Sequence, residues 1–294
     1  MYAASLPSEP VSVPPEAGAG RARPVTRGTA DIAFRRRGDT TGLADLYQQA
    51  PLRVLFPRPA RGDLPAAMLT NTAGGLVGGD ELTIRVRAGA GSAAMACAQA
   101  AEKVYRSTGA DSRVEVALTA EAGAWLEWLP QETILFDGAR LRRRTVIDLA
   151  PEARLLAGEM LVFGRVASGE RFRAGLARDA WEVRLAGRPV WADALHLDTD
   201  IEKILDSPAG FAGATATATL IYAGEDAQAR LTLVRELLAN SGARAAASCV
   251  GGIMLVRWLA ADALALRDDY GRVWAALRHR IAGLPARLPV LWHV

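Results

Sequence analysis

Residues 81–88, with the sequence ELTIRVRA, alternate polar and apolar side chains with a period of two residues. The apolar set is Leu82, Ile84, Val86 and Ala88, and the polar set is Glu81, Thr83, Arg85 and Arg87. Because successive side chains of a strand point to opposite faces, the stretch predicts a β-strand with one buried face and one face in water.

The same alternation returns through most of the chain. It is found at Val114, Val116 and Leu118, at Trp181, Val183 and Leu185, and where Thr215, Thr217 and Thr219 alternate with alanines. Glycine-containing segments such as 89–91, 109–111 and 137–138 separate these stretches and are typical of turns. The pattern predicts a mainly β fold of short strands that follow one another.

Two segments near the C-terminus have the helical period instead. Asp226–Asn240 and Asp262–Ile281 each repeat apolar residues at intervals of three and four. Between them, Gly252–Ala260 (GIMLVRWLA) is typical of a buried strand. We therefore expect one long β-rich body with a small α/β portion that contains two helices near the C-terminus.

Composition sets the class of protein. Residues 1–25 are rich in proline, alanine and glycine and predict a disordered tail, which leaves residues 26–294 as a single domain. Cys97 and Cys249 lack zinc or disulfide spacing, and no apolar run reaches the roughly 20 residues of a membrane helix, so a cytoplasmic location is expected. The net charge of +3 is small and spread along the chain, which does not favour nucleic-acid binding.

Motifs of catalysis are missing from the sequence. It has no GxSxG, HExxH or P-loop pattern, and its three histidines do not stand at ligand spacing. The glycine-rich stretch 73–80 is followed by a predicted strand, whereas a nucleotide loop opens a helix, so a tight turn is the better interpretation. The arginine run 140–144 is interpreted as a solvated strand face and Cys97 as a small buried hydrophobe. A hydrolase with dispersed catalytic residues is the least favoured class.

Four further segments stand out by their sequence: TAGGLVGGDEL at 72–82, QAAEKVYRS at 99–107, LEWLPQETILFDGARL at 126–141 and GRVASGERF at 164–172. Together they resemble the motifs of the urease accessory protein D family, called H in some bacteria. The similarity spans about residues 26–294, although the tail Leu288–Trp292 lacks the arginine that usually precedes the isoleucine-tryptophan pair of the family. The matched motif residues include Gly74, Gly75, Gly78, Gly79, Lys103, Tyr105, Pro130 and Gln131.

The resemblance implies a fold and a function. The family fold is a stacked, β-helix-like arrangement of sheets with a few helices near the C-terminus. Family members are non-enzymatic chaperones that bind apo-urease and the accessory proteins F and G, of which G is a GTPase recruited through F. The assembly inserts nickel into urease. No tightly bound cofactor is expected, only Ni²⁺ in transit.

A nickel path needs ligands that release the ion again. Carboxylates and water suit transit better than clustered histidine or cysteine, which bind nickel too tightly. The acidic residues at matched positions, and so the candidates for such a path, are Asp80, Glu132, Glu170 and Asp193. The sequence leaves one alternative open, which is a purely structural adaptor between urease and the F protein with no contact to nickel.

Overall fold

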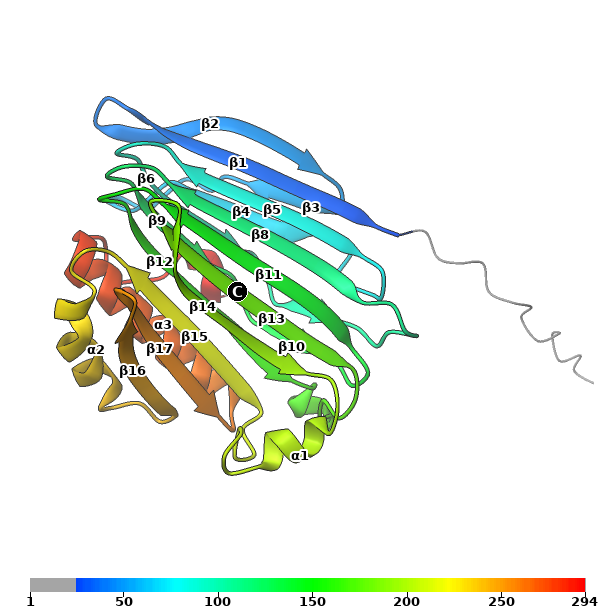
Figure 1. The fold of residues 1–294 in the computed structure, drawn as a ribbon. Coiled ribbons are helices and arrows are strands. Elements are labelled where there is room, and N and C mark those ends of the chain that lie inside the picture. Colours follow the sequence, from blue (N-terminus) through cyan, green and yellow to red (C-terminus); the bar gives the residue numbers. More distant parts are fainter. Residues whose placement is uncertain (1–24, 294) are drawn as a thin grey trace, which may run out of the picture.

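A computed structural model describes residues 25–293, and within them the chain forms two β-sheets that lie face to face (Figure 1). The segment predicted to be disordered lies outside the described residues except for Val25. The first sheet has the strand order β14-β13-β11-β8-β5-β1-β2. Its strands are β1 (Arg27–Arg37), β2 (Thr40–Gln49), β5 (Glu81–Ala88), β8 (Ser112–Ala120), β11 (Arg140–Leu149), β13 (Leu176–Leu185) and β14 (Arg188–Leu197).

The second sheet has the order β16-β17-β15-β12-β9-β6-β4-β3, with β10 paired to β12 and β7 paired to β10. Its strands are β3 (Leu52–Leu55), β4 (Ala66–Asn71), β6 (Ala93–Ala98), β7 (Glu102–Val104), β9 (Trp125–Leu129), β10 (Thr133–Leu135), β12 (Arg154–Phe163), β15 (Ala216–Ala223), β16 (Arg244–Val250) and β17 (Ile253–Ala260).

The chain passes back and forth between the sheets. From β5 to β6, from β8 to β9 and from β11 to β12 it crosses from the first sheet to the second. Each return adds a strand parallel to the one before, as in the pairs β5 with β8, β8 with β11, and β9 with β12. This winding is that of a β-helix, which confirms the predicted stacked, mainly β architecture.

Two apolar layers hold the fold together. The first fills the space between the sheets and includes Leu82, Ile84 and Val86 on the buried side of β5, as their alternation predicts. The second lies between the outer face of the second sheet and the C-terminal helices, with Trp258 and Trp274 at its centre. Since β12 is covered on both faces, nine of its ten residues are buried and its sequence shows no alternation.

The helices agree in part with the sequence patterns. Helix α3 (Ala263–Ala282) begins after Asp262, whose Oδ1 accepts hydrogen bonds from the amides of Leu264 and Ala265. Helix α2 (Leu231–Leu238) is shorter than the predicted 226–240. The reason is that Asp226 accepts hydrogen bonds from Tyr222 and Arg230, and a turn and the 3₁₀ helix Gln228–Arg230 precede α2.

A third helix among the described residues was not predicted from the sequence. It is α1 (Ile201–Asp206), and its six residues are too few to show a helical period. Two further 3₁₀ helices are Val166–Ser168 and Val290–His293. No helix in residues 25–293 combines the length and the apolar character needed to cross a membrane.

Candidate functional site

A cluster of charged side chains lies between the two sheets, where an apolar core would be the ordinary filling. Arg143 is in the inward phase of β11, between the buried residues Leu141 and Thr145. Its Nε donates to Asp179 Oδ1 of β13 at 3.0 Å, and its Nη1 donates to Thr133 Oγ1 of β10 at 3.0 Å. Its Nη2 contacts the carboxyl groups of both Asp179 and Glu159. We call Thr133, Arg143, Glu159 and Asp179 the buried ion cluster.

Burial and proximity decide the charges in this cluster. Burial raises the pKa of Glu159 well above its ordinary value, and the neighbouring charge of Asp179 raises it further. Burial would also raise the pKa of Asp179, but the charge of Arg143 and hydrogen bonds from Glu159 and Arg143 leave that pKa below its ordinary value. The two shifts run in opposite directions, so of the two carboxyl groups Glu159 holds a proton more tightly, whereas Asp179 is favoured as the carboxylate beside Arg143.

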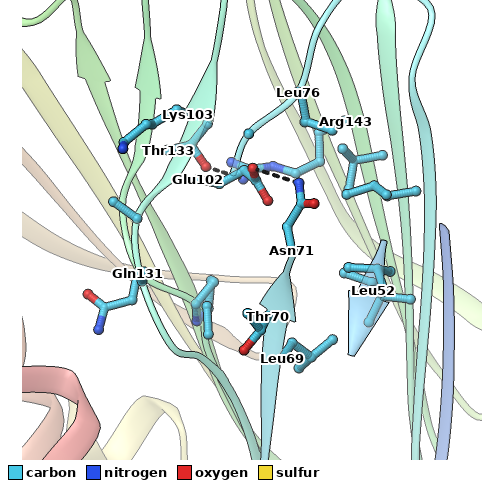
Figure 2. Close-up of a pocket in the computed structure, with 18 of the residues that line it drawn as sticks. Leu52, Leu69, Thr70, Asn71, Leu76, Glu102, Lys103, Gln131, Thr133 and Arg143 are labelled. Carbon is cyan, nitrogen blue, oxygen red and sulfur yellow. Dashed lines mark hydrogen bonds between the residues drawn. The ribbon is translucent and has the colours of Figure 1, made fainter. Parts of the chain in front are cut away.

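A cavity of about 210 Å³ lies on one side of the buried ion cluster (Figure 2). We call it the first cavity. Its walls are largely apolar and include Leu52, Leu69 and Trp128. Its polar residues are Thr70, Asn71, Glu102, Lys103, Gln131, Thr133 and Arg143. Arg143 and Thr133 therefore belong both to the ion cluster and to the wall of this cavity.

Glu102 is the acidic residue of the first cavity. Its Oε1 accepts a hydrogen bond from Asn71 Nδ2 at 3.1 Å, which Figure 2 shows as a dashed line. Burial raises the pKa of Glu102 to about 7, although the Asn71 hydrogen bond and the charge of Arg143 lower it. The side chain can therefore gain or lose a proton near neutral pH.

A second cavity, of about 390 Å³, lies on the other side of the cluster. Glu159 and Asp179 line it, together with Asp193, Trp191 and Arg257. Asp193 of β14 and Arg257 of β17 form an ion pair of 2.6 Å, with side chains that are 45% and 52% exposed. Since β14 and β17 belong to different sheets, this pair connects the two sheets where the second cavity meets solvent.

The four carboxylates predicted to form a nickel path lie in separate places. Asp193 lies at the second cavity, as described above. Asp80 is buried in the glycine-rich turn, where its Oδ2 accepts from the amide of Val77 at 3.0 Å. Glu132 faces Arg267 at 3.5 Å.

Glu170, the fourth, accepts hydrogen bonds from Arg165 at 2.6 Å and from the amide of Asp137 at 3.1 Å. Residues 25–293 contain no group of three or more histidine, cysteine, aspartate or glutamate side chains arranged to hold a metal ion. The structure does not bring the four together, and each has a protein partner.

The matched motif residues meet around the first cavity. Gly74, Gly75, Lys103, Pro130 and Gln131 all line it. The backbone of Gly75 has φ +146°, and an added Cβ would lie 2.5 Å from Tyr105 Cε2. Tyr105 Oη donates to the Gly74 carbonyl at 3.1 Å. Gly78 is equally confined, because an added Cβ would lie 2.2 Å from Ser107 Oγ. Close packing thus explains why glycine stands at these positions, in agreement with the predicted tight turn.

The sequence motifs did not point to Arg143, Glu159, Asp179 or Glu102. The run 140–144 was expected to be a solvated face, which holds for Arg140, Arg142 and Arg144 but is wrong for Arg143. The sequence did contain an indication that Arg143 is buried, because Arg143 lies on the same side of its strand as Leu141, Thr145 and Ile147. An arginine in the apolar phase of an alternating strand predicts a buried acidic partner.

The fold and this site define a class, a β-helix-like two-sheet protein with an ionic interior between its sheets. Residues 26–293 match the model of the UreD urease accessory protein family, and the chain belongs to that family. It is 48% identical over 273 residues to the urease accessory protein UreD of Magnetococcus marinus, covering 91% of this chain and 94% of the relative. It is 41% identical to the UreD of Xanthobacter autotrophicus, covering 99% of this chain and 98% of the relative. The chain thus has a role in urease maturation.

Proposed function

We propose that this chain is a non-enzymatic chaperone that binds apo-urease and the accessory proteins F and G and assists nickel insertion into the urease active site. The names of its relatives support a place in urease maturation. Nickel is cargo in this proposal, so the chain needs no resident metal. The observation that carries the proposal is the row of polar groups that runs through the interior from the second cavity to the first.

This row has the chemistry that a transit path for a divalent cation requires. It contains Asp193, Asp179, Glu159 and Glu102, all on residues that line the two cavities. Oxygen ligands in an open arrangement bind nickel weakly, so the ion can be released. Both cysteines are free thiols, but Cys97 faces the other apolar layer and so lies away from this row. We propose that nickel passes along this interior row, which has Asp193 at one end. This row takes the place of the path that the sequence predicted from all four carboxylates.

The test is to activate apo-urease with the host accessory proteins and measure urease activity and nickel per active site. Omitting this chain should reduce both to background. Asp193→Ala should reduce nickel loading while the complex with urease still forms. Asp148→Ala is the matched control, because Asp148 is a half-exposed carboxylate on the outer face of β11 and pairs with Arg184.

Two outcomes would count against the proposal. If omission of the chain leaves activity and nickel unchanged, its role in nickel insertion is wrong. If omission abolishes loading but Asp193→Ala and substitutions in the buried ion cluster leave it intact, the chain is the structural adaptor and nickel passes elsewhere.

A further inference from the structure

A row of three arginines crosses the outer face of the first sheet, and we call it the basic row. Arg113 of β8, Arg142 of β11 and Arg178 of β13 are direct neighbours, because the parallel register places Arg142 opposite both of the others. All three alternate with buried residues and point away from the core. Adjacent strands are about 4.8 Å apart, so the row extends for about 10 Å across the sheet. Since α2 and α3 pack on the second sheet, this face is open to a partner (Figure 1).

The positive charges of the basic row are only partly compensated. Asp111 accepts hydrogen bonds from Arg142 at 2.5 Å and from Arg140 at 2.6 Å, so two guanidinium groups share this one carboxylate. Within residues 25–293, the side chains of Arg113 and Arg178 form neither a hydrogen bond nor an ion pair, and both are exposed. The row therefore keeps an excess of positive charge.

At both ends of the basic row the next strand offers no free carboxylate. Glu81 of β5 is the cross-strand neighbour of Arg113, but its carboxylate pairs with Arg27 at 2.8 Å. At the other end, His196 of β14 already has Asp198 at 3.0 Å. The uncompensated charge is thus confined to the three strands of the row.

The basic row departs from the charge pattern of its own sheet face. Elsewhere on this face opposite charges are cross-strand neighbours, as Arg85 is of Asp31 and Arg184 is of Asp148. Like charges directly opposite each other destabilise a sheet, so the row costs the fold stability. Glu115, the nearest acidic residue along β8, is exposed and forms no ion pair with the row. A local arrangement that costs stability is expected at functional sites, where a ligand compensates it.

We propose that the basic row is a docking site for an extended acidic segment of a partner protein. Every second side chain of an extended chain points to the same side at intervals of about 7 Å, so successive carboxylates at alternate positions fall within the length of the row. Each carboxylate can accept two parallel hydrogen bonds from one guanidinium. Arg113 and Arg178 gain in the complex the carboxylate partners that they lack in the free chain. The inference goes beyond the proposed function, because it does not depend on a path for nickel.

The size and surroundings of the basic row favour an acidic peptide over a nucleic acid. Single-stranded nucleic acids are bound by long basic grooves with aromatic side chains on which the bases stack. The row is short and bounded by paired charges. Of the aromatic side chains that are exposed within residues 25–293, none lies on β8, β11 or β13.

Fluorescence anisotropy of labelled peptides with the full chain tests the docking site. The probe is a peptide of about eight residues that alternates glutamate and serine, which is long enough to span the row when extended. The matched peptide has glutamine in place of glutamate. At low ionic strength only the glutamate peptide should bind, and the double variant R113Q/R178Q should weaken that binding about tenfold or more.

The matched control is R35Q/R87Q, which removes the same charge from two exposed arginines at the opposite end of the strands of this sheet. It should bind the glutamate peptide as the wild-type chain does. Equal losses in the two double variants would show non-specific attraction and overturn the docking site, and so would the absence of binding. Tighter binding of single-stranded DNA through Arg113 and Arg178 would make the row a nucleic-acid site, and the proposal would be wrong.

Urea denaturation gives an independent test that needs no ligand. Because the charges of the row repel one another, R113Q/R178Q should raise the midpoint of urea denaturation of the free chain, and high salt should reduce the gain. R85Q, which breaks the pair with Asp31, should not raise the midpoint. A lower midpoint for R113Q/R178Q would mean that the two arginines support the fold instead of awaiting a partner, and this result would also overturn the proposal.

Discussion

Arg278 of α3 and Glu127 of β9 form an ion pair of 3.1 Å in which neither side chain is exposed to solvent. Glu127 also accepts hydrogen bonds from the indole nitrogens of Trp125 and Trp274, and Arg278 reaches Asp63 at 2.6 Å. Burial raises the pKa of Glu127, while the charge of Arg278 and these hydrogen bonds oppose that rise. The pair fixes the C-terminal helix to the outer face of the second sheet, whereas the proposed path lies between the two sheets.

Arg278→Ala should therefore destabilise the whole fold. It would leave Glu127 buried without its counter-charge, and breaking such a pair costs about 3–5 kcal/mol. Urea denaturation followed by circular dichroism measures the free energy of unfolding. Arg280→Ala, on the exposed side of the same helix, is the control. Equal losses for the two variants would contradict the anchoring role of Arg278.

The glycine-rich turn gives a second prediction. At Gly75 an added Cβ would lie 2.5 Å from Tyr105 Cε2 and 2.7 Å from the Lys103 carbonyl. Gly75→Ala should lower the free energy of unfolding by about 2 kcal/mol or more, from strain and overlap combined. Gly74→Ala is the matched control, because Gly74 also has positive φ but nothing lies within 4 Å of its Cβ position, so only about 1 kcal/mol of backbone strain is expected. Thermal unfolding of both variants gives the comparison, and a milder effect at Gly75 would show that the turn is not closely packed.

The two thiols should react differently with an alkylating reagent. Burial raises the pKa of Cys97 to about 12, and its side chain is 1% exposed, whereas Cys249 is partly exposed on the edge strand β16. Since the thiolate is the reactive form, iodoacetamide at pH 8 should label Cys249 alone in the folded protein and both residues in urea. Mass spectrometry of digested protein counts the labels. Rapid native labelling of Cys97 would contradict its buried position.

The sequence predicts those parts of the fold in which one face of a strand meets water. On β5 the alternation of apolar and polar residues gives the strand, its buried side and its limits. On β8 and β13 it finds the strand but only part of its length, since the alternating stretches 114–118 and 181–185 lie within Ser112–Ala120 and Leu176–Leu185, and Leu185 is exposed. It does not give the pairing, because an alternating strand fits a sandwich, a barrel or a β-helix equally well. The stacked arrangement was predicted from the family resemblance, and the parallel register of β5, β8 and β11 confirms it.

The site was harder to predict because its residues come from strands that lie far apart in the sequence. Arg143 and Asp179 become neighbours through the parallel register of β11 and β13, and Glu159 reaches them from the opposite sheet. No short motif contains these three. Asp193 was a candidate because it is an acidic residue at a position matched to the family, but the sequence did not indicate its partner Arg257, which belongs to the other sheet.

The raised pKa of Glu102 makes the stability of the protein depend on pH. Its ordinary value is 4.5, and burial raises it to about 7 in the folded chain. The folded state therefore binds this proton more tightly than the unfolded state, so the contribution to stability is fully present below pH 4.5 and is lost as the pH rises through 7. Glu102→Gln cannot lose a proton, so it should be more stable than the wild-type protein at pH 8, on the order of 2 kcal/mol, and the difference should vanish near pH 4.5. Urea denaturation at a series of pH values measures this, with Glu115→Gln as the exposed control that leaves the wild-type profile unchanged. A variant that gains stability at pH 8 while loading nickel slowly would show that Glu102 is kept for function at a cost in stability. Parallel pH profiles would instead mean that the carboxyl group titrates as an ordinary glutamate.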